Sequence, residues 1–162
     1  MPEPTLTSIN THEAAVCRFR FSSPYGEIAY VWDGRCCHSL DLNADVAHLA
    51  VHDDPVSRWL AAYFAHDILP SLPPLSEAAS TFQCRLRQAL LAMPQGATCT
   101  YGELAAQLHS GAQAVGQALG ANPLPVLVPC HRVLSAKGLG GFSCGLPWKR
   151  ALLVHEGVAL PV

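Results

Sequence analysis

The sequence predicts an α/β protein with two domains, a small antiparallel sheet with one helix followed by a mainly helical domain. Apolar and polar residues alternate at period two in residues 16–21, which is typical of a half-buried strand. Beyond residue 80, apolar residues recur at helical spacing, which is typical of amphipathic helices. A proline-rich stretch with few charges, residues 70–75, separates the two patterns, so we place the domains at residues 1–78 and 79–162.

The first domain is predicted to contain three strands, at residues 16–21, 27–32 and 35–42, after a loosely attached segment of residues 1–14. Asp33-Gly34 predicts a tight hairpin between the second and third strands,. A helix begins at Asp54-Pro55, because an acidic cap precedes proline at the first helical position. Its apolar residues fall at helical spacing and are predicted to pack on the sheet: Val56, Trp59, Leu60, Tyr63 and Phe64,.

The second domain begins with two helix-start signals. Capping-box spacing occurs twice, in Ser80 with Gln83 and in Thr100 with Glu103,. The second of these helices is predicted to run to about residue 109, and after a Ser-Gly turn another helix covers residues 112–119. A helix, a tight turn containing glycine and a second helix form a helix-turn-helix.

The helix at residues 112–119 is thin and uncharged. Small residues occupy every second position, and Gln113 and Gln117, four residues apart, share its outer face,. Such a helix could lie deep in a groove, or it could be an ordinary surface helix packed through its alanines; the pattern leaves both open.

Composition excludes some classes of protein. Half of the 162 residues are apolar and 14% are charged, so a substantial core is expected. No run of apolar residues is long enough for a membrane span, and no secretory signal is visible. The seven cysteines are odd in number and lack the spacing of small disulfide-bonded proteins. They therefore indicate reduced thiols and a cytoplasmic protein.

Four residues of the first domain could offer zinc ligands but fit no standard spacing, so no metal is expected: Cys17, Cys36, Cys37 and His38,.

The charges are distributed unevenly between the two halves. Residues 1–79 carry four arginines and ten acidic residues, a net charge of −6, whereas residues 80–162 carry six cations and two acidic residues, a net charge of +4. This asymmetry is expected of a chain that binds a polyanion through one domain, and it is equally compatible with chance segregation.

Cys130 is the candidate nucleophile of the chain. It lies between Pro129 and His131, at the end of the apolar run Val126-Leu127-Val128. Pro129 biases the preceding residue toward an extended conformation, which would give a stiff, buried approach. A thiol beside an imidazole is expected to form thiolate near neutral pH. A buried structural cysteine is the alternative.

The sequence around this cysteine resembles a known family. Pro129-Cys130-His131-Arg132-Val133 is similar to the active-site signature of the O6-alkylguanine-DNA alkyltransferases. The resemblance extends from about Thr81 to Gly157, and it includes Pro94-Gln-Gly96-Ala-Thr-Cys-Thr-Tyr101-Gly-Glu, Ala121-Asn122-Pro123, residues 138–145 and His155-Glu156-Gly157. It implies a ribonuclease H-like first domain and a winged-helix-like, DNA-binding second domain.

The resemblance also implies a function. Proteins of this family reverse alkylation damage directly, by moving the alkyl group from O6-alkylguanine, with O4-alkylthymine as a second substrate, to their own cysteine in a single turnover. They need no cofactor. They bind double-stranded DNA through the minor groove as monomers and rotate the damaged base out of the helix.

Five residues would be catalytic by this resemblance. Cys130 would attack the alkyl carbon, and His131 would remove its proton through a water. Glu156 would orient His131; an isolated carboxylate at the end of a helix is disfavoured by the helix dipole, which also indicates a buried partner. Tyr101 would protonate the leaving guanine, and Asn122 would support the turn that carries the cysteine.

Further residues would contact the DNA or the damaged base: Gln113, Ala114, Arg132, Ser143 and Cys144. Two of them depart from the family pattern. Gln113 occupies the position of an arginine that fills the gap left by the rotated base, so we expect weaker extrusion or a preference for looser substrates. Cys144 could change which alkyl groups fit, or pair with Cys130 under oxidation.

Two other functions remain open on sequence grounds. A non-catalytic, alkyltransferase-like protein that only binds the lesion would share this DNA-binding domain, but such proteins lack the cysteine. A cysteine hydrolase would use Cys130 and His131, although adjacent residues do not resemble the pairs that hydrolases assemble from distant segments.

Overall fold

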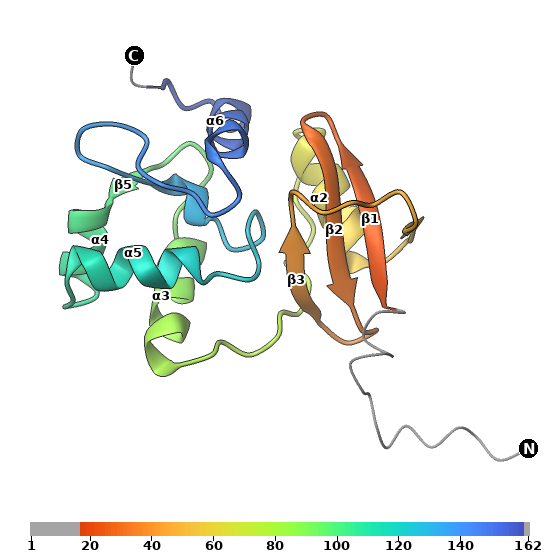
Figure 1. Ribbon diagram of the computed structural model, residues 1–162, viewed down its shortest axis with the longest axis horizontal. Coiled ribbons are helices and arrows are strands. Elements are labelled where there is room, and N and C mark those ends of the chain that lie inside the picture. The colour runs from red at the N-terminus through yellow and green to blue at the C-terminus, as the bar shows by residue number, and fades with distance from the viewer. Residues whose placement is uncertain (1–16, 161–162) are drawn as a thin grey trace, which may run out of the picture. The chain divides into compact units, whose positions relative to one another are not determined.

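The computed structural model describes residues 17–160, and the chain divides into two compact units, Met1–Leu75 and Ser76–Val162. The division falls a few residues before the boundary placed from the sequence. The first unit is a sheet covered by a helix and the second is mainly helical, so the mixed α/β class is confirmed (Figure 1). The segment of residues 1–14, predicted to be loosely attached, lies outside the described residues.

The sheet of the first unit has the order β3-β2-β1-β4. Strands β1 (Arg18–Ser23), β2 (Gly26–Trp32) and β3 (Cys37–Asp41) are antiparallel, and β4 (Ala50–Val51) pairs in parallel with β1. The three predicted strands are confirmed to within two residues at each end. The sequence did not predict β4, because two residues show no periodicity.

The turn at Asp33 differs from the prediction of a two-residue hairpin. It extends to Cys36, and the Asp33 Oδ1 accepts hydrogen bonds from the backbone N–H groups of Arg35 (2.7 Å) and Cys36 (2.8 Å). This is an Asx-type turn, in which the aspartate side chain replaces a backbone acceptor. Gly34 has a φ of 91° there, a conformation that a side chain would disfavour.

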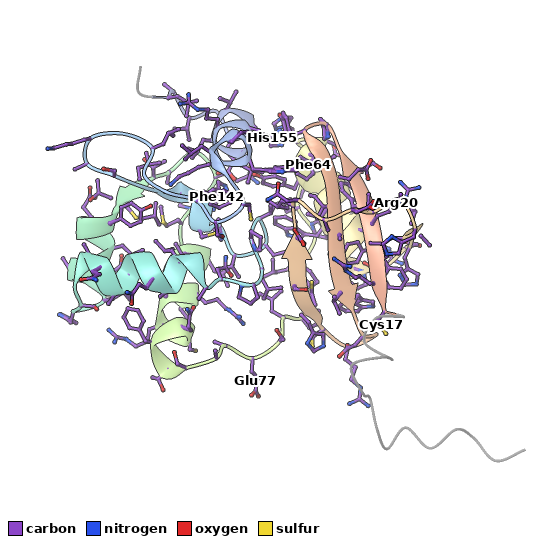
Figure 2. All side chains as sticks on the ribbon, viewed as in Figure 1. Cys17, Arg20, Phe64, Glu77, Phe142 and His155 are labelled. Atoms are coloured by element: carbon purple, nitrogen blue, oxygen red, sulfur yellow. The ribbon has the colours of Figure 1, made fainter. Side chains whose placement is uncertain are left out.

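Helix α2 (Pro55–Phe64) begins as predicted. Asp54 caps it in a reciprocal arrangement with Ser57, and the Asp54 carboxylate also accepts a hydrogen bond from the Tyr30 hydroxyl (2.7 Å) on β2. The five predicted packing residues are all buried. Phe64, labelled in Figure 2, packs toward β1, and its ring centroid is 6.0 Å from that of Phe21. These contacts fix the helix on the sheet.

The second unit contains four α-helices among the described residues: α3 (Thr81–Leu91), α4 (Tyr101–Gln107), α5 (Ala112–Gly120) and α6 (Leu146–His155). Two short strands, β5 (Cys99–Thr100) and β6 (Val133–Leu134), pair in parallel beside them. A 3-10 turn, η1 (Cys130–Arg132), precedes β6. The core consists of buried side chains from these elements, including Leu86, Leu90, Leu104, Val115, Leu119, Leu152 and Leu153.

The predicted helix starts and helix-turn-helix are present. Ser80 and Thr100 cap α3 and α4 by accepting from the backbone N–H groups three residues on. The Gln83 side chain does not complete its capping box; it donates to the Ala118 carbonyl (2.9 Å) and so ties α3 to α5. Helix α4 ends at Gln107, earlier than predicted, and the chain turns toward α5 through His109, whose φ is 52°.

No helix among the described residues has the length and apolar composition that a bilayer span would need.

Candidate active site

The loop between α5 and η1 leads to Cys130, and the side chain of Asn122 holds this loop in shape. The Asn122 amide nitrogen donates to the Val128 carbonyl (3.0 Å), and its oxygen accepts from the Leu124 N–H (3.0 Å). One side chain therefore joins the two ends of the loop between α5 and η1. This is the supporting position that the sequence suggested for Asn122.

The approach to Cys130 is a series of turns, and the predicted extended approach is wrong. Pro129 has φ −79° and ψ 66°, and the Cys130 N–H donates to the Val128 carbonyl (2.7 Å), which together form an inverse γ-turn. Val126 has a φ of 74°, where a β-branched residue is strained by about 1–3 kcal/mol. Burial of the apolar run, which was predicted, is what holds this conformation.

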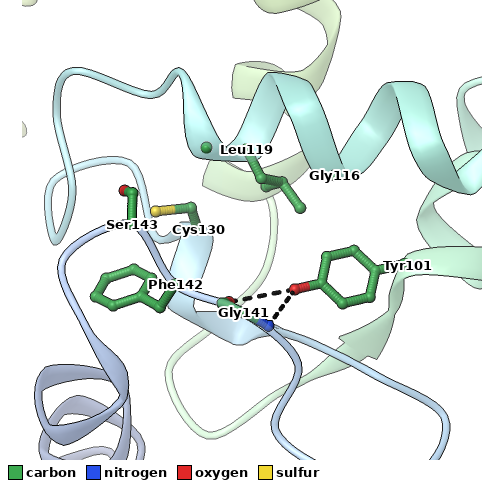
Figure 3. A pocket seen from close by; sticks show the side chains of 8 residues that line it. Tyr101, Gly116, Leu119, Cys130, Gly141, Phe142 and Ser143 are labelled. Carbon is green, nitrogen blue, oxygen red and sulfur yellow. Dashed lines mark hydrogen bonds between the residues drawn. The ribbon is translucent and has the colours of Figure 1, made fainter.

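Cys130 opens onto a pocket of about 200 Å³. The residue is 5% exposed. Figure 3 shows Tyr101 at one end of the pocket and Cys130 with Ser143 at the other. The remaining wall comes from α5 and from the loop before α6: Gly116, Leu119, Gly120, Gly141 and Phe142. A cavity of this size with an aromatic wall and bare backbone suits a flat ring system.

The loop wall is held by Tyr101 and Lys149. The Tyr101 hydroxyl both donates to the Gly141 carbonyl and accepts from its N–H (3.2 Å each; Figure 3). A methyl group on Gly140, whose φ is 73°, would lie 2.7 Å from the Tyr101 ring and hydroxyl. Lys149 is fully buried and donates to the carbonyls of Val133 (2.7 Å) and Gly141 (2.9 Å).

Sequence reasoning missed Lys149. Burial lowers the pKa of its ammonium to about 8, an effect that the nearby Cys130 opposes. The signal was its spacing, because Lys149 precedes the buried Leu152 and Leu153 by three and four residues and so shares their helical stripe,. Phe142 and the bare backbone of α5 were also missed as pocket walls.

His131 and Glu156 form the pair predicted from the sequence. The His131 Nε2 lies 2.6 Å from the Glu156 Oε2, and both side chains are 0% exposed. Because the carboxylate can only accept, the proton is at Nε2 and Nδ1 carries a lone pair. Burial lowers the pKa of His131, although Glu156 raises it in part. His131 is therefore an uncharged base.

The Cys130 thiol is not activated in the way the sequence suggested. Burial raises its pKa to about 11, and a hydrogen bond from Asn122 and the charge of Lys149 offset this only in part. The resting group is a thiol rather than a thiolate, because the low dielectric disfavours the charge. Its reaction therefore needs a base to take the proton.

Arg132, which was predicted to contact the DNA or the damaged base, is a buried residue. It is 6% exposed, and its guanidinium binds the Glu156 carboxylate and the Met93 carbonyl. The sequence motif could not show that Arg132 is buried, since a basic residue in a DNA-binding domain can either contact DNA or form an internal ion pair.

The other residues predicted to contact the DNA or the base have different positions. Ser143 lines the pocket, Gln113 and Ala114 are exposed on α5, and Cys144 is half-buried in the loop after Ser143.

Only some of the candidate zinc ligands of the first unit lie close together. Cys36 and His38 lie with Asp33 at the β2–β3 turn, and their candidate ligand atoms are within 4.8 Å of one another. Asp33 already binds His38 at 2.7 Å. The group does not include Cys17 or Cys37, which the sequence had placed among the candidates.

The chain is similar to known proteins over most of its length. A family profile described as "6-O-methylguanine DNA methyltransferase, DNA binding domain" matches residues 81–158. The methylated-DNA--protein-cysteine methyltransferase of Saccharolobus solfataricus is 32% identical over 144 residues, which cover 87% of this chain and 95% of that protein. The protein of the same name from Mycobacterium bovis is 44% identical over 105 residues, 63% of this chain and 64% of that protein.

A solved structure is similar over nearly the whole chain. The crystal structure of Mycobacterium tuberculosis OGT in complex with DNA has a TM-score of 0.74 at 35% identity, and the match covers 86% of this chain and 91% of that one. The mixed α/β fold is therefore shared with that structure.

Proposed function

The chain belongs to the methylated-DNA--protein-cysteine methyltransferase family, the O6-alkylguanine-DNA alkyltransferases, and we propose that its substrate is O6-alkylguanine, with O4-alkylthymine second. The protein repairs DNA by direct reversal, moving the alkyl group onto Cys130. The observation that carries this assignment is the position of Cys130, which opens onto a pocket next to a buried His131–Glu156 pair.

The reaction is a single displacement. The Cys130 sulfur forms a bond to the alkyl carbon as the bond from that carbon to O6 breaks. The thiol proton passes through a water to the His131 Nδ1, and the leaving guanine takes up one proton, so the overall proton count is unchanged. A thioether is stable to water, so each molecule reacts once.

Tyr101 and Ser143 act on the leaving base in this proposal. Tyr101 lines the pocket, and its hydroxyl would turn its proton from the Gly141 carbonyl to the base, because protonation makes guanine a better leaving group. Ser143 lies at the end of the pocket that contains Cys130 and supplies a hydroxyl for the O6 atom. Asn122 keeps the sulfur in place through the loop that it joins.

DNA binds across α5 in this proposal, through the minor groove and with the damaged base rotated into the pocket. Gly116, Leu119 and Gly120 bring this helix to the pocket edge, and Gln113 and Ala114 are exposed on it. Because α5 carries no charge, most of its contact with DNA is steric, with amide hydrogen bonds from Gln113.

The finer architecture follows from the same family. The first unit is ribonuclease H-like, supported by three antiparallel strands with a fourth parallel strand at the edge. The second is winged-helix-like, supported by the turn that joins α4 to α5. The protein acts as a monomer in the cytoplasm, where a reducing environment keeps the free thiol of Cys130 reactive,.

Mass spectrometry tests the function. After incubation with an oligonucleotide that contains O6-methylguanine, the peptide carrying Cys130 should gain about 14 Da, the mass of one methyl group replacing hydrogen on the covalent nucleophile. The peptides carrying the other cysteines serve as internal controls. Binding to the oligonucleotide without any gain in mass would indicate a lesion-binding protein instead.

Gln113→Arg should raise the rate on duplex DNA by about tenfold, equivalent to about 1.4 kcal/mol. Arginine adds a charge and a flat guanidinium that can fill the gap left by a rotated base. The rate on single-stranded substrate, which needs no gap filled, should change little. Gln117→Arg is the matched control, because it adds the same charge to the same face; an equal gain there would mean that charge alone is responsible.

A further inference from the structure

Glu156 is a carboxylate in an unfavourable place. Its side chain is 0% exposed, and it caps the C-terminal end of α6, where the partial negative charge of the helix dipole opposes another negative charge. A buried carboxylate without a compensating cation becomes protonated. His131 needs the ionised form of Glu156 as a hydrogen-bond acceptor. A neighbouring cation therefore has to stabilise that form.

Arg132 supplies that support. Its Nε lies 2.7 Å from the Glu156 Oε1 and its Nη2 lies 3.1 Å from Oε2, so both oxygens are bound by one planar fork. The guanidinium is itself anchored, because Nη1 donates to the Met93 carbonyl at 2.6 Å. The Arg132 side chain is 8% exposed, so solvent screens this pair little.

His131 has a single hydrogen-bond partner among the described residues. Its Nε2 binds Glu156, and its Nδ1 is buried without any partner in the part of the chain that the structure describes. A protonated Nδ1 would be a buried cation with nowhere to donate. A neutral Nδ1 is an acceptor that is ready for a proton.

The balance of charge around His131 is set by three groups. Glu156 is negative, Arg132 and Lys149 are positive, and all three act on the imidazole. The net charge facing the ring is already positive, so protonating His131 would add a further positive charge to a closed interior. If Arg132 were uncharged, only Lys149 would oppose Glu156, and protonating His131 would cost less.

We propose that Arg132 is a positioning residue of alkyl transfer: by neutralising Glu156 it keeps His131 uncharged, so that the imidazole accepts the Cys130 proton. Arg132 touches neither the substrate nor the sulfur and acts only through Glu156 and His131. This inference rests on the proposed function, since it assigns a role within that reaction. It replaces the DNA contact expected of Arg132 from the sequence.

The consequence is a defined dependence on pH. A base must be uncharged to act, so the rate is full above the pKa of His131 and is lost as the pH falls through it. Removing the charge of Arg132 takes away one of the two cations that oppose Glu156, leaving Lys149 and burial, and so raises that pKa. The acid limb of the pH–rate profile should therefore move to higher pH by about one to three units in Arg132→Gln.

NMR of the free protein tests the inference without any substrate. In protein labelled with nitrogen-15 in histidine, the His131 ring signals, assigned by their loss in His131→Gln, should report a neutral ring with the proton on Nε2 near neutral pH. In Arg132→Gln the same signals should report an imidazolium. Arg132→Lys keeps the charge but loses the fork, and it should leave His131 neutral.

The rates complete the test. Alkyl transfer by Arg132→Gln should be slow near neutral pH and recover at higher pH, whereas Arg132→Lys should keep the wild-type profile. A loss of rate that is equal at every pH, or an imidazolium in the wild-type protein, would overturn the inference. An imidazolium in the wild-type NMR measurement would overturn the inference even if Arg132→Gln fails to fold. Because this measurement uses no DNA, it also separates this inference from the proposed function, which fails only if no methyl reaches Cys130.

Discussion

Cys130→Ala should abolish alkyl transfer and leave the second unit folded and able to bind DNA that contains the lesion. The exchange removes one sulfur atom from a site that is 5% exposed, and such a loss costs about 1 kcal/mol of stability. It also removes the strongest nucleophile among the residues that line the pocket, since the hydroxyls of Tyr101 and Ser143 are much weaker nucleophiles than a thiolate,. Mass spectrometry and a gel-shift measurement on the same oligonucleotide would report the two properties separately.

Cys144→Ala is the matched control for this experiment. It makes the same chemical change in the loop after Ser143, and it should leave the gain of mass on the Cys130 peptide intact. Transfer that persisted in Cys130→Ala would mean that another thiol accepts the alkyl group. Loss of transfer in Cys144→Ala alone would make Cys144 the acceptor and the position of Cys130 incidental.

His131→Gln should slow alkyl transfer by about 10²–10⁴-fold, the usual contribution of a general base. Because burial raises the pKa of the Cys130 thiol to about 11, little thiolate is present near neutral pH without that base. Glutamine can still donate to Glu156, so the fold is preserved while the proton acceptor is lost. Single-turnover rates on the methylated oligonucleotide would measure the loss.

The pH dependence distinguishes a lost base from a distorted site. The slow transfer that remains in His131→Gln should increase as the pH rises toward the pKa of the thiol, because hydroxide then replaces the missing base. His48→Gln, the same exchange at an exposed position of the first unit, should behave as wild type. A rate close to wild type in His131→Gln would show that the thiol ionises without the imidazole.

Local sequence signals predicted the elements of the fold well. The caps at Asp54, Ser80 and Thr100 and the alternation of β1 depend on neighbouring residues, and so they can be seen in the sequence. The pair formed by His131 and Glu156 came from a motif combined with an isolated carboxylate at a helix end. The physical cause of the caps and of the alternation lies within a few residues of its effect, whereas the His131–Glu156 pair spans 25 residues and was found through the family resemblance.

The features that escaped prediction depend on the tertiary structure. Strand β4 exists only because β1 is beside it, and the left-handed Val126 is held by the packing of its buried neighbours. The destination of the Arg132 guanidinium is set by Glu156, which is 24 residues away. The pKa of Cys130 is governed by burial, and the sequence shows the imidazole next to the thiol but not the low dielectric around it.

The division of the chain has an evolutionary consequence. Among the described residues, those that line the pocket and the buried pair behind Cys130 all come from Ser76–Val162. Substitutions in the first unit can accumulate, or that unit can be exchanged for another, without altering a reacting group. The two halves of this gene are therefore free to diverge at different rates.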